Sequence, residues 1–287
     1  MNYELTEICM TIEDLKRVQE IDYELLCTVD DLCKKHNIQY CLMFGALLGA
    51  VRHKGQIPWD DDIDIAMTRD NYLRFFEVAN KEFAGGKYFV KVMGSGSLDY
   101  VSELKLGVKN TLYCMPGCEE CETMNSVTLD VFCFDYAKKY SDRKFRTLNA
   151  IAQKLWLIKQ NAGEKKLLKI CIDKSNVRMK CIYKLGVNIM LMIRSIFGEK
   201  FFEKIVYKMF VDETCTSDCY WERTSPHYFP RKWMDETVEL DFGYRQFPCP
   251  KGYDALLTAH YGDYMKLPPV EKRVRKNFDI WIFREKL

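Results

Sequence analysis

The longest regular pattern in the chain is a set of apolar side chains spaced three or four residues apart between residues 12 and 35. Its members are Leu15, Val18, Ile21, Leu25, Val29 and Leu32. This spacing puts them on one face of a helix, so we expect a long amphipathic helix over residues 12–35. Thr11, followed three residues later by Asp14, resembles a capping box with Asp in place of the usual Glu, and it marks the start of the helix.

Shorter apolar patterns follow this helix. Residues 38–43 predict a short buried strand, Gly45 predicts a tight turn, and a helix is expected from about Ala46. Helix and strand patterns then alternate to about residue 136. We therefore expect an α/β (α+β) core.

Within this alternation, residues 59–67 combine a strand-like pattern with an acidic run. The run holds four carboxylates in five residues, Asp60, Asp61, Asp62 and Asp64. Strand side chains alternate between faces, so we expect Asp62 and Asp64 to project side by side while Ile63 and Ile65 face the core. Two carboxylates so close repel one another unless a cation lies between them, and Mg²⁺ or Mn²⁺ prefers oxygen ligands. The alternative is a solvated acidic turn, such as an N-capping cluster.

The segment before the acidic run offers groups that suit a phosphate. Gly45 lets the backbone approach a ligand closely, and the helix from Ala46 presents N–H groups and a positive dipole end. Arg52 and His53 follow before the acidic strand, although a loop histidine without a catalytic role is the alternative for His53. A phosphate-binding segment facing a metal-binding segment is the arrangement used in nucleotidyl and phosphoryl transfer.

Two blocks of the sequence resemble one known family. Residues 44–65 (FGALLGAVRHKGQIPWDDDIDI) are similar to the signature of the LicD family, which comprises phosphotransferases with a nucleotidyltransferase fold and includes the fukutin-related enzymes. Residues 261–269 (YGDYMKLPP) are similar to the closing motif of the family, and residues 250–257 fit the same pattern. The resemblance implies a nucleotidyltransferase-like mixed sheet flanked by helices. It also implies transfer of a phospho-alcohol, typically phosphocholine from CDP-choline, onto a sugar of a cell-surface glycan.

The same resemblance implies a third carboxylate on a later strand, for which Asp130 is the candidate. A lone Asp in the apolar run 127–134 is poorly suited to a buried strand unless it is paired or ligates a metal, so a capping or salt-bridged acid is the alternative. Asp135, at the end of that run, is interpreted as structural. We therefore assign Asp62, Asp64 and Asp130 as catalytic residues and as ligands of Mg²⁺ or Mn²⁺.

Further residues are interpreted as contacts of the substrate. Ala46 stands where the wider superfamily carries Ser or Gly, so a side-chain hydroxyl is missing there while the backbone N–H groups remain. Lys105 belongs to an alternating segment with Glu103 and Lys109, and it either contacts a pyrophosphate or faces solvent. Asp60 and Asp61 are expected to position Arg52 or to cap the turn. The substrate-binding candidates are Gly45, Ala46, Arg52, His53, Lys105, Tyr261 and Asp263.

Composition changes after residue 137. Residues 138–208 contain 18 Lys or Arg against 5 Asp or Glu, in a chain whose net charge is only +2. Basic clusters alternate there with large apolar groups, which predicts a basic helical insertion that either lies on an anionic membrane surface or packs on the core. No nucleic-acid-binding module accompanies the charge. We divide the chain into a nucleotidyltransferase-like core over 1–137, the insertion over 138–210, and a C-terminal segment over 211–287 that completes the core.

The N-terminus shows no basic segment followed by an apolar one, so we expect a cytoplasmic protein, with peripheral contact at the inner face of a membrane as an option. The 13 cysteines are scattered through apolar segments and are typical of reduced thiols. Cys114, Cys118 and Cys121 are the exception, because their spacing allows a structural Zn²⁺ with a fourth ligand such as Cys133.

These features give a hypothesis for the reaction. A divalent cation on Asp62 and Asp64 bridges the pyrophosphate of a CDP-alcohol, and a hydroxyl of a glycan or glycolipid, such as lipopolysaccharide or teichoic acid, attacks the β-phosphorus and releases CMP. Asp130 completes the metal site and acts as base on that hydroxyl. The alternatives are a nucleotidyltransferase that releases pyrophosphate and a non-catalytic binding protein on the same fold.

Overall fold

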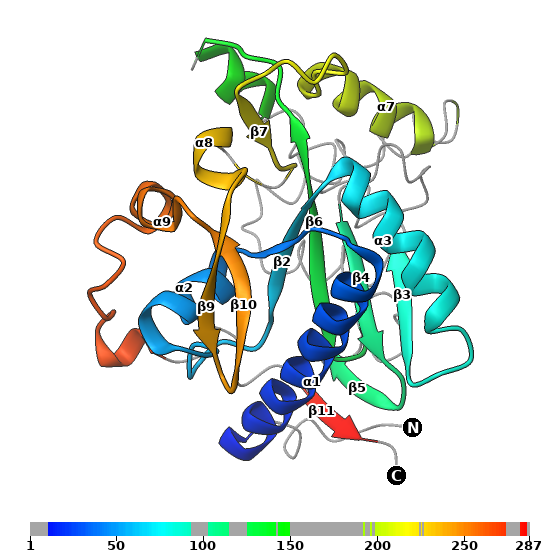
Figure 1. The fold of residues 1–287 in the computed structure, drawn as a ribbon, viewed down its shortest axis with the longest axis vertical. Helices are drawn as coiled ribbons and strands as arrows, with labels where there is room; N and C mark the ends of the chain where they lie inside the picture. Colours follow the sequence, from blue (N-terminus) through cyan, green and yellow to red (C-terminus); the bar gives the residue numbers. More distant parts are fainter. Residues whose placement is uncertain are drawn as a thin grey trace. The chain divides into compact units, whose positions relative to one another are not determined.

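Figure 1 shows the computed structural model of the chain. It describes residues 11–92, 103–114, 125–141, 143–149, 199–223, 225, 227–273 and 282–285, together with residues 192 and 196. The chain forms two compact units, one of residues 1–91, 103–134 and 229–287, and one of residues 92–102 and 135–228. The division expected at residues 137 and 210 stays a prediction.

The first unit begins with the long helix α1 (Ile12–His36), which confirms the expected amphipathic helix. Thr11 and Asp14 form the capping box reciprocally, each side chain accepting from the other residue's backbone N–H. The helix ends where Asn37 adopts the left-handed conformation at φ 50°. All six predicted apolar residues are buried, so the periodicity identified the core face of the helix correctly.

A mixed sheet forms the centre of this unit and confirms the predicted α/β class. Its strand order is β1 (Cys41–Leu42), β2 (Asp64–Thr68), β6 (Thr128–Tyr136), β4 (Glu103–Val108) and β3 (Tyr88–Val92). Strand β2 runs antiparallel to β1 and parallel to β6, while β4 runs antiparallel to β6.

The register of the three central strands determines where the polar side chains lie. Asp64 of β2 is paired with Asp130 of β6, which is paired in turn with Lys105 of β4. Paired residues of neighbouring strands share a face of the sheet, so these three side chains form one polar row. The residues on either side of them along the strands are apolar and fully buried, as Ile65, Val131 and Leu106 show.

Helices cover the sheet in this unit. Helix α2 (Phe44–His53) and helix α3 (Arg69–Glu82) pack against β2, and α1 packs against β4 and α3 (Figure 1). The expected turn at Gly45 is wrong, because α2 already begins at Phe44 and Gly45 is its second residue. The chain reverses at Phe44 itself, which adopts φ 47°, directly after the N–H of Met43 donates to the backbone oxygen of Asp64.

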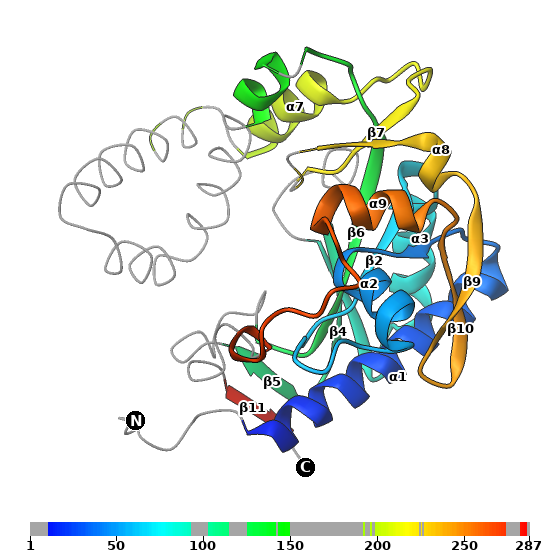
Figure 2. The same cartoon turned by 90° about the vertical axis from the view of Figure 1, so that its left-hand side faces the viewer.

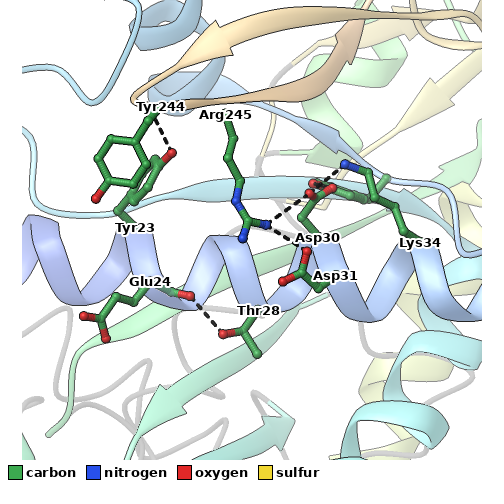
Figure 3. A network of polar contacts seen from close by, with 9 residues as sticks. Tyr23, Glu24, Thr28, Asp30, Asp31, Lys34, Tyr244 and Arg245 are labelled. Carbon is green, nitrogen blue, oxygen red and sulfur yellow. Dashed lines mark hydrogen bonds and ion pairs between the residues drawn. The ribbon is translucent and has the colours of Figure 1, made fainter.

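A β-hairpin made of β9 (Thr237–Phe242) and β10 (Arg245–Pro250) joins this unit late in the sequence. It lies along α2 and β1 (Figure 2). Figure 3 shows how its tip is bound to α1: Arg245 donates to Asp31 at 2.8 Å, and its guanidinium is 3.9 Å from the buried Asp30. The hairpin therefore brings the C-terminal segment against the N-terminal helix.

The remaining elements of the first unit are short. They are β5 (Thr111–Cys114), which pairs with β11 (Ile282–Glu285), α8 (Arg231–Met234), α9 (Tyr253–Tyr261) and a 3₁₀ turn at Val270–Lys272. Lys109 lies in the turn between β4 and β5 and donates to the backbone oxygen of Gly86 at 2.7 Å. The expectation that it shares a strand face with Lys105 is therefore wrong.

The second unit is built on the end of β6 and on α7 (Glu199–Phe210). The buried Asp135 pairs with Trp221 of β7 (Cys219–Trp221), and the Trp221 ring stacks on Phe210 at 4.4 Å. Strand β8 (Tyr228–Pro230) lies at the boundary between the units. Most of the basic segment 138–208 lies outside the described residues. In the part of the chain that the structure describes, no helix is both long and apolar enough to span a bilayer.

Candidate functional site

The acidic run forms a cluster in the loop between α2 and β2. Oxygens of Asp60, Asp61 and Asp62 all lie within 4.8 Å of one another, a spacing that suits the ligands of one metal ion. Helix α1 holds this loop, because Gln19 donates from Nε2 to the backbone oxygens of Ile57 at 3.2 Å and Asp60 at 2.7 Å. The three carboxylates are thus held together by the backbone that carries them.

Two further contacts fix individual carboxylates of this cluster. The hydroxyl of Tyr113, on β5, donates to Oδ2 of Asp61. Asp60 lies against the first turn of α2, where a Cβ atom added to Gly45 would come within 2.6 Å of its Oδ2. A negative charge is favourable at a helix N-terminus, so Asp60 occupies part of the position that the sequence suggested for a phosphate.

Asp62 and Asp64 differ in their setting. The sequence placed both on one strand, but β2 begins at Asp64, so the exposed Asp62 belongs to the preceding loop and the half-buried Asp64 to the sheet. Ile63 and Ile65 are fully buried, as predicted. Within the described residues, neither the Asp62 nor the Asp64 carboxylate accepts a hydrogen bond or forms an ion pair.

The negative charges of these carboxylates repel one another. Partial removal from water, and after it the negative charges of Asp60, Asp61 and Asp130, raise the pKa of Asp62 to about 8. Burial and then Asp62, Asp130 and Asp60 raise the pKa of Asp64 as well. The site therefore carries more negative charge than its protein neighbours neutralise.

Asp130 is neutralised by Lys105. The ammonium Nζ lies 2.6 and 2.7 Å from the two carboxylate oxygens of Asp130 and 3.8 Å from Glu103. Burial disfavours the charged form of Lys105, but Asp130 and then Glu103 outweigh it and raise its pKa above the ordinary value. The alternative of a solvent-facing Lys105 is wrong, since its side chain is only 16% exposed and is paired.

The two sequence blocks meet at Arg52. Its Nη1 donates to the backbone oxygen of Tyr264 at 2.8 Å, and its Nε donates to Nε2 of His53 at 2.9 Å. Burial and then the charge of Arg52 lower the pKa of His53, so this histidine is a neutral acceptor at pH 7. Its ring also contacts Trp59 edge to face, with 5.8 Å between the ring centroids.

The residues of the closing motif do not all face the site. Tyr261 is 40% exposed; partial burial, followed by the negative charges of Asp64, Asp60 and Asp62, raises its pKa, so its phenol lies within the electrostatic influence of these acids. Tyr264 donates instead to Asp254 at 2.7 Å and is buried. Asp263 is exposed in the bend after α9, and its contact with substrate stays a prediction.

Sequence reasoning missed three residues around the site: Gln19, Asp22 and Tyr113. Gln19 and Tyr113 carried no signal, because a lone amide or phenol is common on any element. Asp22 did carry one. It lies within the apolar periodicity of α1 and is fully buried, where an acid is rarely placed without a partner.

The predicted zinc cluster is only partly within the described chain. Cys114 at the end of β5 and Cys133 in β6 are buried cysteines, while Cys118 and Cys121 lie outside the described residues. The zinc assignment stays a prediction.

The chain is similar to several known proteins. Residues 37–153 match the family model described as LicD/FKTN/FKRP, nucleotidyltransferase domain. The chain is 28% identical over 270 residues to the lipopolysaccharide cholinephosphotransferase LicD of Haemophilus influenzae, covering 90% of this chain and 93% of that protein. It is also 43% identical over 56 residues to an uncharacterized protein of Rickettsia typhi, covering 20% of this chain and 18% of that protein.

Proposed function

We propose that this chain, which carries a LicD-family nucleotidyltransferase domain over residues 37–153, is a phosphotransferase that acts on a cell-surface glycan. The donor is a CDP-alcohol, with CDP-choline as the first candidate, and the products are the phosphorylcholine-substituted acceptor and CMP. Lipopolysaccharide is the first candidate acceptor, because the relative that covers 90% of the chain is a lipopolysaccharide cholinephosphotransferase. Teichoic acid and other glycolipids are further candidates.

The observation that carries this proposal is the surplus of negative charge beside the first turn of α2. Four carboxylates of the run 60–64 lie near Asp130, and the ammonium of Lys105 is bound by Asp130 and Glu103. Hard oxygen donors in this number fit Mg²⁺ or Mn²⁺. We assign Asp62 and Asp64 as its main ligands, with Asp130 completing the site. Of these three, only Asp62 belongs to the set of oxygens that lie within 4.8 Å of one another, together with Asp60 and Asp61, so the cation would draw Asp64 and Asp130 toward that set.

The chemistry that such a cation supplies when bound is neutralisation of charge on the donor's phosphate oxygens. The chain's own residues position the substrates. Arg52 has five N–H donors and uses two of them for Tyr264 and His53, so the others are available for a phosphate oxygen. Gly45 and Ala46 present the backbone of the first turn of α2 to the same anion.

Asp130 is proposed to accept the proton of the attacking hydroxyl. A carboxylate has about four acceptor positions, and Lys105 occupies two of those on Asp130, which keeps it oriented without using all of its lone pairs. The hydroxyl oxygen forms a bond to the β-phosphorus while the bond from that phosphorus to the bridging oxygen breaks, and CMP leaves. Tyr261 is proposed to contact the donor or the acceptor beside the acidic cluster.

Two finer expectations are part of the proposal. The basic segment 138–208 is proposed to touch an anionic membrane surface, where a glycolipid acceptor is presented, and the reaction is proposed to take place in the cytoplasm at the inner face of that membrane. The alternative activity is nucleotidyl transfer from a nucleoside triphosphate, which the description of the matched domain keeps open.

A single product analysis tests the proposal. The protein is incubated with Mg²⁺ and either CDP-choline or CTP, in the presence of lipopolysaccharide that lacks phosphocholine, and CMP and pyrophosphate are measured. We expect CMP in proportion to phosphocholine on the acceptor, and none with Asp62→Asn or Asp64→Asn. Pyrophosphate from CTP would instead support a nucleotidyltransferase. Neither product with any CDP-alcohol (choline, ribitol or glycerol) would favour a binding protein.

A further inference from the structure

Asp22 of α1 is a buried carboxylate without a hydrogen-bond partner in the described part of the chain. It is fully shielded from solvent, and neither of its side-chain oxygens has a hydrogen-bond partner among the described residues. A buried acid in this situation costs free energy in both protonation states, because the carboxylate lacks donors and the neutral acid lacks an acceptor for its proton. The described residues supply no such partner, so a bound group is a candidate for it.

The position of Asp22 on α1 directs it toward the acidic cluster. Gln19 is three residues earlier and so lies on the same side of the helix, and it binds the backbone of the loop that carries the cluster, at Ile57 and Asp60. Three negative groups, Asp62, Asp61 and Asp130, and one positive group, Lys105, act on the Asp22 carboxyl. Burial and then those three acids raise its pKa well above the ordinary value.

We propose that Asp22 is a positioning residue of the divalent-cation site: it supplies a buried negative charge and accepts a hydrogen bond from water bound to the cation, from the α1 side of the cluster. This inference rests on the cation of the proposed function, but not on the reaction. Asp22 is not among the acids whose oxygens lie within 4.8 Å of one another, and neither are Asp64 and Asp130, so its proposed role is contact with a water on the cation and not direct ligation. Mg²⁺ and Mn²⁺ retain water ligands in proteins, and a carboxylate that accepts from such a water orients it and adds to the affinity.

The charge balance supports this role over a permanently neutral acid. In the cation-free protein, burial and then the negative charges of Asp62, Asp61 and Asp130 disfavour the ionised form of Asp22. A bound dication reverses that balance and favours the ionised carboxylate. The burial of Asp22 strengthens its interaction with the cation, because little water lies between them to screen it.

The test measures the affinity of the protein for Mn²⁺ in the absence of nucleotide, with electron paramagnetic resonance to detect the free ion. Asp22→Asn removes the charge while it keeps the size and an acceptor oxygen, so we expect a Kd for Mn²⁺ roughly tenfold or more above the wild-type value. The control is Glu20→Gln, which removes one negative charge from the exposed side of the same helix and should leave the Kd unchanged. The melting temperature of the cation-free Asp22→Asn protein should equal or exceed that of the wild type, since a buried group that is unfavourable to ionise is replaced by a neutral amide.

Each other possible result either supports or overturns the proposed role of Asp22. Wild-type affinity in Asp22→Asn would overturn the inference and leave Asp22 as a neutral buried acid, and so would a wild-type protein that binds no Mn²⁺. If Asp22→Asn did not fold, Asp22→Ser, which is smaller and also uncharged, would be measured in its place. A protein that transfers no phosphocholine but loses Mn²⁺ affinity on Asp22→Asn would end the proposed function and keep this inference.

Discussion

Arg52 and Tyr264 are 212 residues apart in the sequence and joined by a hydrogen bond of 2.8 Å from the guanidinium to the backbone oxygen. Arg52 lies in the last turn of α2, directly before the acidic loop, and Tyr264 belongs to the closing motif. The negative charges of Asp64, Asp60 and Asp62 act on Tyr261, three residues before Tyr264. The bond therefore ties the segment that carries the proposed cation site to the segment that carries Tyr261.

Replacing Arg52 by Lys should separate the structural role of this residue from its proposed role in binding phosphate. Lysine keeps the charge but lacks the planar guanidinium, so it cannot donate to Tyr264, His53 and a phosphate oxygen at the same time. We therefore expect kcat/KM to fall about tenfold or more. The lost hydrogen bonds should lower the free energy of unfolding by only about 1–2 kcal/mol. Steady-state kinetics and urea unfolding measure the two effects. The control is Lys54→Arg, at an exposed neighbour; equal losses in both variants would contradict the assignment.

Gly45→Ala should damage the site without damaging the fold. The new Cβ would lie 2.6 Å from Oδ2 of Asp60, so that carboxylate must move away from the first turn of α2. Alanine favours a helix over glycine by up to about 1 kcal/mol, so stability should be unchanged or higher. We expect weaker Mn²⁺ binding and lower activity at an unchanged melting temperature.

The matched control for this variant is Gly86→Ala, where the added atom would meet only ordinary contact at 3.5 Å from the Phe83 oxygen. Wild-type cation affinity in Gly45→Ala would show that the position of Asp60 is not required.

The sequence was sufficient for features that depend on local periodicity. The spacing of Leu15, Val18 and their successors identified α1 and its buried face, and the alternation around Ile63 identified the inner face of β2. The start of α2 was harder to predict, because Phe44 adopts the left-handed conformation. Glycine adopts this conformation far more readily, so the sequence suggested the turn at Gly45 instead.

Contacts between distant segments could not be derived from local pattern. The pairing of Lys105 with Asp130 depends on the register of β4 against β6, and a shift by one residue would have separated them. Tyr113 reaches Asp61 only because β5 is placed near the acidic loop. The charge of Asp22 was visible in the sequence, but its meaning required knowing that the same side of α1 faces that loop.

The stability of the cation-free protein should decrease as pH rises from about 4 to about 8. The pKa of Asp62 is raised to about 8 in the folded state and is near 4 when unfolded, so the folded state binds more protons across this window. The stabilising contribution of its protonated form is complete below pH 4 and is lost as pH rises through 8. Melting temperatures measured in EDTA across this range should show the decline.

Two further measurements connect that decline to the acidic cluster. Asp62→Asn should make the pH profile flatter, because the titrating group is absent. Mg²⁺ should raise the melting temperature most at pH 8 and above, where the carboxylates are ionised. A profile that is identical in wild type and Asp62→Asn would show that this carboxyl does not titrate in the window.

Lys105→Met should be the most destabilising single change in the polar row of the sheet. It leaves the Asp130 carboxylate, only 14% exposed, without its counter-ion, and breaking a buried pair in this way costs about 3–5 kcal/mol. The double variant with Asp130→Asn removes the unpaired charge and should recover most of that loss in urea unfolding. The exposed pair of Lys139 with Asp218 offers the control, since solvent screens it and Lys139→Met should cost far less stability than Lys105→Met. If the double variant were no more stable than Lys105→Met alone, the loss would come from packing of the lysine side chain, and Asp130 would not depend on Lys105 for its charge.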